Sequence, residues 1–135
     1  MSFARFAKLY AIAMVTMMAL DGLWLGVIAK SFYAVEMGHL TRSDVQWLPA
    51  LLFYVIYAGA VVELVVRPAL ERRSVMRAAA LGALLGLASY GAFDLTGLAM
   101  FTAFPPLGAV VDLAWGVCVT TIVSVVVTRL SMPRA

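Results

Sequence analysis

Leu9 to Ile28 reads LYAIAMVTMMALDGLWLGVI, an apolar run interrupted by one charged residue, Asp21. About 20 predominantly apolar residues in a helix cross the hydrocarbon layer of a bilayer. The run therefore predicts a membrane-spanning helix, which we place at about residues 4–28. Arg5 and Lys8 precede the run, a beginning that a secretory signal peptide also has. Three further apolar runs favour a first transmembrane helix.

The composition supports this interpretation for the whole chain. Of 135 residues, 64% are hydrophobic and 13% are charged, which lies outside the range of soluble domains. The further runs cover about residues 48–66, 76–100 and 107–130. We predict an all-α polytopic membrane protein, one transmembrane domain over residues 1–135 folded as a four-helix bundle whose immediate partner is the lipid bilayer.

Lysine and arginine are divided unequally between the two sides of the predicted bundle. The connection before the second span has Lys30 and Arg42, and the connection before the fourth span has none. The other basic residues share the opposite side: Arg5, Lys8, Arg67, Arg72, Arg73, Arg77, Arg129 and Arg134. The positive-inside rule then predicts a multi-pass membrane protein with both termini in the cytoplasm. Because these charges lie at the ends of apolar runs, we expect no nucleic-acid partner.

The first connection, residues 29–46, is the only one long enough to form structure of its own. Phe32, Tyr33 and Val35 alternate there with Lys30 and Glu36. This pattern is typical of a short amphipathic helix at the outer membrane interface. A lid over a site below is the alternative interpretation.

Three aspartates lie inside the apolar runs: Asp21, Asp94 and Asp112. A carboxylate in the hydrocarbon layer costs several kcal/mol unless it has a partner, so each one indicates a functional site. Counting residues from the outer ends of the spans places the three within roughly 3 Å of one depth. We therefore predict that they converge in a shared pocket in the outer half of the membrane. The structural alternative is that each aspartate only fixes helix packing through private hydrogen bonds.

Neighbouring residues suggest how the aspartates are partnered. Trp24 and Trp115 each follow an aspartate by three positions on the same helix face, where an indole N–H can donate to a carboxylate. Since their helices are antiparallel, we expect the two indoles to bracket the acidic layer from opposite sides. Gly82 and Gly86 form a small-xxx-small pair below Asp94, which favours a position facing a neighbouring helix. The aromatic residues of the second span, Phe53, Tyr54 and Tyr57, are candidates to line a cavity.

Several motifs together resemble one family. They are Asp21-x-x-Trp24-Leu25-Gly26, Tyr90-Gly91-x-x-Asp94-Leu95-Thr96 and Val111-Asp112-x-x-Trp115-Gly116. The chain is similar over nearly its whole length to the domain of unknown function 2177 family, which comprises small four-helix bacterial inner-membrane proteins. The resemblance implies the same topology but supplies no activity. It also implies a polar core of Asp21, Trp24, Tyr90, Asp94, Thr96, Asp112 and Trp115, which we take as the candidate ligand-binding residues.

Three functional hypotheses arise from clustered carboxyl groups, whose desolvation and mutual repulsion favour a bound proton or cation. The leading hypothesis is binding or transport of a small solute, cation or lipid-like ligand through the aspartate cluster. The alternative is an accessory subunit docked on a larger membrane complex that handles lipids or an electron carrier. Because four spans enclose little room for a pathway, we also expect a homo-oligomer or a subunit of a larger membrane complex. A membrane enzyme with an aspartate pair is the third. We predict no cofactor and no metal site, because His39, Glu36 and Asp44 match no metal-binding spacing.

Overall fold

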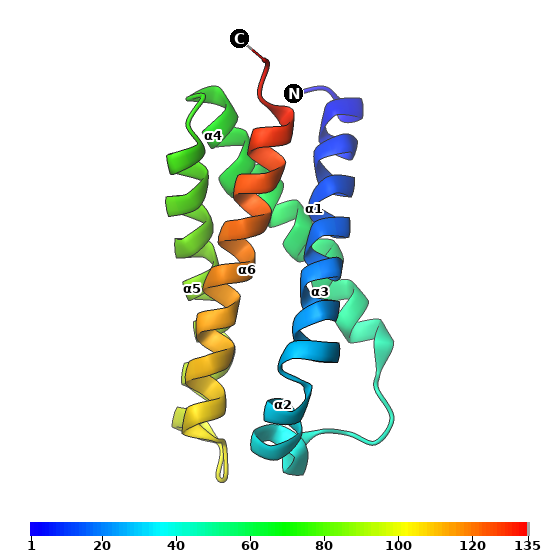
Figure 1. Ribbon diagram of the computed structural model, residues 1–135, viewed down its shortest axis with the longest axis vertical. Coiled ribbons are helices and arrows are strands. Elements are labelled where there is room, and N and C mark those ends of the chain that lie inside the picture. The colour runs from blue at the N-terminus through cyan, green and yellow to red at the C-terminus, as the bar shows by residue number, and fades with distance from the viewer. Residues whose placement is uncertain (135) are drawn as a thin grey trace.

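The computed structural model describes residues 1–134, and it confirms the all-α prediction. Four helical rods are long and apolar enough to cross a membrane: Phe3–Ile28, Trp47–Glu71, Val75–Met100 and Pro106–Ser131. Figure 1 shows that they run along one long axis, with both termini at one end of the molecule. No β-strand occurs within the described residues.

The first rod consists of α1 (Phe3–Leu23) and a π-helical continuation, η1 (Trp24–Ile28). The Ser2 hydroxyl caps its beginning by accepting a hydrogen bond from the Arg5 N–H at 3.2 Å. Two short helices come next, α2 (Lys30–Met37) and the 3₁₀ turn η2 (Gly38–Leu40). A helix is therefore present in the connection for which the sequence predicted an amphipathic one.

The second rod is longer than the sequence predicted. It consists of α3 (Trp47–Ala60), the π-helical η3 (Val61–Val66) and α4 (Arg67–Glu71), whereas the sequence prediction ended this span at about residue 66. A proline within a helix removes a hydrogen bond and crowds the preceding turn. Because η3 ends just before Arg67, Pro68 lies in the first turn of α4, where proline is tolerated.

The last two rods, α5 (Val75–Met100) and α6 (Pro106–Ser131), form a closely packed antiparallel pair. Glycines allow this approach. A Cβ atom added to Gly86 would lie 2.5 Å from the carbonyl oxygen of Gly116, and one added to Gly82 would lie 2.7 Å from Ser124 Oγ. A Cβ on Gly116 would meet the ring of Tyr90. Backbone contact at small residues is how helices associate where lipid tails are as apolar as leucine.

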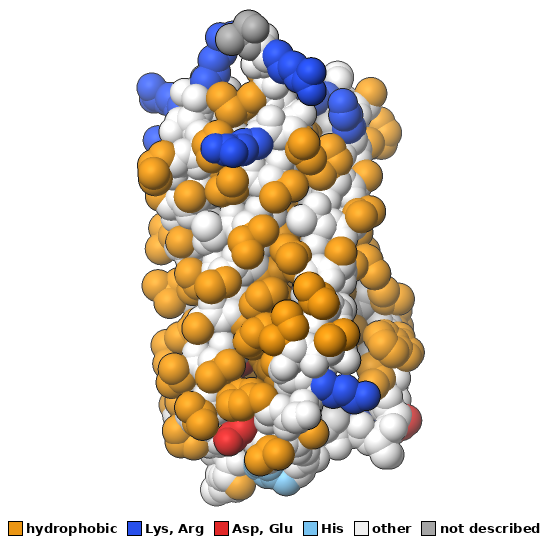
Figure 2. Space-filling view, viewed as in Figure 1, with side chains coloured by type: hydrophobic (Ala, Val, Ile, Leu, Met, Phe, Trp, Pro, Cys, Tyr) orange, Lys and Arg blue, Asp and Glu red, His pale blue; other side chains and the backbone are white. Residues whose placement is uncertain are grey.

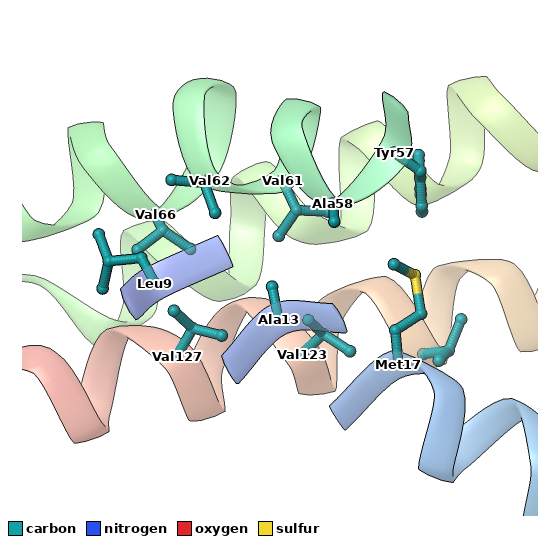
Figure 3. Close-up of a cluster of buried hydrophobic side chains, with 11 residues drawn as sticks. Leu9, Ala13, Met17, Tyr57, Ala58, Val61, Val62, Val66, Val123 and Val127 are labelled. Carbon is teal, nitrogen blue, oxygen red and sulfur yellow. The ribbon is translucent and has the colours of Figure 1, made fainter. Parts of the chain in front are cut away.

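An apolar core joins the first two rods to α6 in the half of the bundle that carries the termini. Figure 3 shows Val61, Val62 and Val66 of η3 facing Ala13 of α1 and Val123 of α6. The full cluster comprises Leu9, Ala13, Met17, Tyr57, Ala58, Val61, Val62, Val66, Val119, Val123 and Val127. Branched valines packed against alanines fix the helix positions at this level, so the polar residues beyond them rest on a rigid base.

At the opposite end, α3 departs from the bundle. Figure 1 shows it leaning across behind α1 and α6 toward the end that carries α2. Within the described residues, its backbone approaches α1 and η3 but neither α5 nor α6. The backbones of α3 and α5 are therefore separated in the half of the bundle that contains the aspartates.

The surface matches a membrane environment. Figure 2 shows apolar side chains along the length of the molecule and most lysine and arginine side chains at the end that carries the termini. The basic side chains therefore gather at one end of the molecule, as the topology prediction assumed. Which end faces the cytoplasm remains a prediction.

Candidate functional site

Asp94 of α5 and Asp112 of α6 lie next to each other, their carboxyl groups within hydrogen-bonding reach. The Asp94 side chain is 0% exposed, and no N–H or O–H group of the described residues donates to either of its oxygens. Two carboxylates contain no proton to donate, so a hydrogen bond between them requires one shared proton. The close packing of α5 and α6 thus places the buried side chain of Asp94 next to a second acid, Asp112.

Asp112 receives its hydrogen bond from α2. The Tyr33 hydroxyl donates to Asp112 Oδ1 at 2.8 Å and accepts from Trp24 Nε1 at 3.1 Å. Burial raises the pKa of Tyr33 well above its ordinary value, so the hydroxyl keeps its proton and remains a donor. The helix α2 therefore contacts the carboxyl pair through the Tyr33 hydroxyl.

Two further contacts join α2 and η2 to the hairpin formed by α5 and α6. His39 Nε2 donates to the carbonyl oxygen of Ala103 at 2.6 Å, in the turn between the two helices. Beside that turn, a Cβ atom on Gly108 would lie 3.2 Å from Met37 Cε and 3.3 Å from Glu36 Cβ. The absence of a side chain at Gly108 lets α2 rest directly on α6.

Asp21 has different surroundings from the pair. It is 6% exposed and accepts two hydrogen bonds, from the Tyr54 hydroxyl at 2.6 Å and from Trp115 Nε1 at 2.9 Å. These donors come from α3 and α6, so Asp21 joins three helices. Its buried charge is compensated by polar groups of the protein itself.

Of the two indoles expected to donate to a carboxylate, Trp115 does so and Trp24 does not. Neither indole donates to the aspartate of its own helix: Trp115 donates to Asp21 across the α1–α6 interface, and Trp24 donates to Tyr33. The rings do not bracket an acidic layer either, because they stack on each other with centroids 4.6 Å apart and planes at 8°. Stacking in the interface buries one face of each ring and turns the N–H groups toward neighbouring elements.

The expected convergence of three carboxyl groups in one pocket is also wrong. Within residues 1–134, no group of three or more His, Cys, Asp or Glu side chains is arranged to hold a metal ion. Asp94 and Asp112 form a pair, and Asp21 stands apart with its own donors. The two parts are linked through Tyr33, Trp24 and Trp115, since the stacked indoles occupy the interface between them.

Tyr90 and Thr96 of α5 have separate environments. Tyr90 packs against Gly116 and lies edge-on to Tyr57, with ring centroids 6.3 Å apart. Thr96 is exposed, and its hydroxyl donates to the Ala92 carbonyl of its own helix. Tyr90 therefore lies near the Asp94–Asp112 pair, whereas Thr96 lies outside the site.

Two grooves reach the aspartates from the side of the bundle. One of about 280 Å³ opens where α3 diverges from α5, and its lining residues are Phe53, Ser89, Tyr90, Phe93 and Asp112. The other, of about 350 Å³, lies between α1 and α3 and is lined by Met18, Asp21, Gly22, Leu25, Gly26, Trp47 and Tyr54. We call the first the α3–α5 groove and the second the α1–α3 groove.

Two hydroxyl donors, Tyr33 and Tyr54, were not among the candidate ligand-binding residues, although Tyr54 was expected to line a cavity. Both are separated from their acceptors by many positions, 79 for Tyr33 and Asp112 and 33 for Tyr54 and Asp21. Their residue type was the available signal, because a tyrosine near a buried acid can place its hydroxyl there.

The comparison with known families agrees with this architecture. Residues 6–129 match the family described as "Predicted membrane protein (DUF2177)". The chain belongs to that family. DUF2177 is thus the family that the sequence motifs indicated, and the protein is a multi-pass membrane protein. No curated protein and no solved structure matches the chain.

Proposed function

We propose that this DUF2177 protein binds or transports a small solute, cation or lipid-like ligand in the bacterial inner membrane, using Asp94 and Asp112 as a proton-responsive pair. The observation that supports the proposal is the position of Asp94, fully buried beside Asp112 with no hydrogen-bond donor to its oxygens among the described residues. Asp21, by contrast, accepts two hydrogen bonds from the protein.

Electrostatic repulsion between Asp94 and Asp112 is what would make the pair respond to a proton or a cation. Two neighbouring carboxylates repel each other strongly where the dielectric constant is low. The salt bridges of the described residues join Arg42 to Asp44 and Arg67 to Glu63 and Glu71, so none of them neutralises the pair. A shared proton or a bound cation relieves the repulsion, and occupancy by one excludes the other.

Infrared difference spectroscopy tests the proposal directly. In lipid nanodiscs near neutral pH, the wild-type protein should show the C=O stretching band of a protonated carboxyl group, identified by ¹³C-labelled aspartate. Asp94→Asn should remove this band, and Asp44→Asn, at an exposed loop position, should retain it. A wild-type spectrum without a protonated aspartate would refute the proposal.

An accessory or oligomeric role is the second candidate, and α1 supplies the observation that favours it. Among residues 1–134, a Cβ added to Gly22 or Gly26 meets no atom within 4 Å apart from its chain neighbours and the backbone of its own helix. These glycines are four positions apart on an exposed face, a spacing that suits close contact with another transmembrane helix. Pull-down in mild detergent should then recover a second copy or a larger complex, and Gly22→Leu should lose it while the carboxyl band persists.

A further inference from the structure

We infer that the ligand of the α3–α5 groove is a lipophilic organic cation, an amine or quaternary ammonium group on an apolar body, that enters sideways from the membrane. This inference rests on the proposed function and assigns a chemical class to its ligand. It is built on three features of the groove: its aromatic walls, its unneutralised acids and its lateral opening.

Aromatic side chains form most of the groove wall. Phe53 of α3 and Phe93 of α5 are 44% and 56% exposed and lie at its mouth, while Tyr90 is half-buried. The face of an aromatic ring attracts a cation through its quadrupole, and rings recognise quaternary ammonium groups in this way. Ser89 contributes one hydroxyl to the same wall.

The acidic side chains at the groove favour a positively charged ligand. Asp112 lines it and Asp94 adjoins Asp112, whereas no lysine, arginine or histidine is among its lining residues. The one hydrogen bond found for the pair within residues 1–134 comes from the neutral Tyr33 hydroxyl. The α1–α3 groove contrasts with it, because Asp21 already accepts two hydrogen bonds.

The opening of the groove indicates where the ligand comes from. Its mouth lies between α3 and α5 on the lateral surface of the bundle, where a membrane protein meets lipid. About 280 Å³ is just below the range of pockets that enclose a drug-sized molecule. The groove therefore suits a small charged head with a few attached carbons, and the rest of an apolar body extends past Phe53 and Phe93 into the membrane.

Binding of such a cation has a measurable consequence. The shared proton of Asp94 and Asp112 is no longer needed once a positive charge lies beside them, so it leaves to bulk water. One permanent cation enters as about one proton is released. Release and binding should have the same concentration dependence.

Three probes with the same tail test this inference in nanodiscs of zwitterionic lipid. They are octyltrimethylammonium, octanol and octyl sulfonate, which carry a positive, a neutral and a negative head. Binding is read from the fluorescence of Trp24 and Trp115 in a Trp47→Phe background, and proton release is read with an indicator dye. We expect saturable binding with proton release for octyltrimethylammonium, and only unsaturable partitioning for the other two.

Matched variants locate the binding. Asp112→Asn should weaken octyltrimethylammonium binding by at least about tenfold, and Phe53→Leu should weaken it roughly threefold. Phe101→Leu, at an exposed phenylalanine outside the groove, and Asp44→Asn should bind as the wild type does. Phe53→Leu keeps the test decisive if Asp112→Asn fails to insert.

The outcomes separate this inference from the function on which it rests. Equal binding of octanol or octyl sulfonate would overturn the cation assignment, as would binding that Phe53→Leu leaves unchanged. Absence of octyltrimethylammonium binding in a protein that shows the protonated carboxyl band would also overturn it, and the proposed function would stand. Absence of the band itself would remove both.

Discussion

The buried aspartates Asp21 and Asp94 differ in the number of hydrogen bonds that they accept, and this difference determines what each can do. Asp21 accepts hydrogen bonds from Tyr54 and Trp115, and Asp94 accepts none from the described residues. A buried charge without a donor is destabilising, whereas a buried charge with good donors costs little net free energy. Asp21 therefore holds helices together, and Asp94 is the acid that gains from a proton or a cation.

The same isosteric substitution should therefore lower the stability at Asp21 but not at Asp94. Asp21→Asn weakens two charge-assisted hydrogen bonds and should lower the free energy of unfolding by about 1–2 kcal/mol. Asp94→Asn removes a repulsion and supplies an NH₂ donor for Asp112, so the free energy of unfolding should be unchanged or higher. Reversible unfolding in mixed micelles measures both. Equal losses for the two variants would show that Asp94 is a structural aspartate as well.

The sequence identified the acids of this site but could not assign their partners. Asp21, Asp94 and Asp112 were conspicuous because ionisable residues are costly in an apolar run. Their donors could not be assigned, since Trp115 lies 94 positions from Asp21 and Tyr33 lies 79 from Asp112. Pairing across helices depends on rotation about each helix axis, which a nearly uniform apolar pattern does not reveal.

At the scale of elements, the contact between α5 and α6 brings the carboxyl pair together. Gly86→Ala would place a Cβ atom 2.5 Å from the Gly116 carbonyl oxygen and 3.0 Å from the Val117 Cα atom. Backbone atoms cannot turn aside as a side chain can, so the helices must separate. We expect a loss of about 1–3 kcal/mol of stability, together with loss of the protonated carboxyl band as Asp94 moves away from Asp112.

The control for this prediction is Gly22→Ala on α1. Apart from the chain neighbours and the backbone of the same helix, no atom of the described residues lies within 4 Å of the added Cβ atom. Alanine is favoured over glycine within a helix by up to about 1 kcal/mol. Gly22→Ala should therefore be neutral or stabilising in the same unfolding assay. If both alanine variants behave alike, glycine packing does not hold α5 against α6.

The helix α2 depends on a single hydroxyl for its contact with the carboxyl pair. Tyr33→Phe removes the donor to Asp112 and the acceptor for Trp24, so α2 should become more mobile. A spin label at Val35→Cys, a position 80% exposed, reports this mobility once the one native cysteine is replaced by Cys118→Ser. Tyr10→Phe, whose hydroxyl donates to the Val55 carbonyl, should leave the spectrum unchanged.

The pH dependence of this contact is set by the raised pKa of Tyr33. The fold favours the neutral hydroxyl, so the contribution of Tyr33 is complete below the ordinary tyrosine pKa of about 10 and is lost only as pH rises beyond it. In an Asp94→Asn background, where the carboxyl pair no longer shares its proton, the spin-label spectrum should stay constant from about pH 6 to about pH 9. A change in that interval would mean that another group controls α2.

The elements themselves were largely predictable, since long apolar runs leave few alternatives in a membrane. The π-helical segments η1 and η3 were not. Each adds a residue to a turn and so rotates the next part of the helix about its axis, and η1 begins at Trp24, whose indole bonds to Tyr33. The sequence has no pattern that predicts this rotation, because the rotation results from packing between helices.

For the whole molecule, the asymmetry of charge predicts its orientation in the membrane. Figure 2 shows basic side chains concentrated at the end with both termini, and eight of the ten lysines and arginines were assigned to that side from the sequence. Such an excess marks the cytoplasmic side. The carboxyl pair lies toward the opposite end, so this orientation puts it nearer the outer surface.

Labelling of single cysteines tests the orientation. In a Cys118→Ser background, Ser43→Cys lies in the loop after η2, and a cysteine added after Ala135 marks the C-terminal end. We expect a membrane-impermeant maleimide to label Ser43→Cys in intact spheroplasts and the terminal cysteine only after the membrane is permeabilised. The reverse pattern would place the termini outside and the Asp94–Asp112 pair in the cytoplasmic half. The α3–α5 groove would then take its ligand from the inner leaflet, and the direction of any proton-linked movement would be inverted.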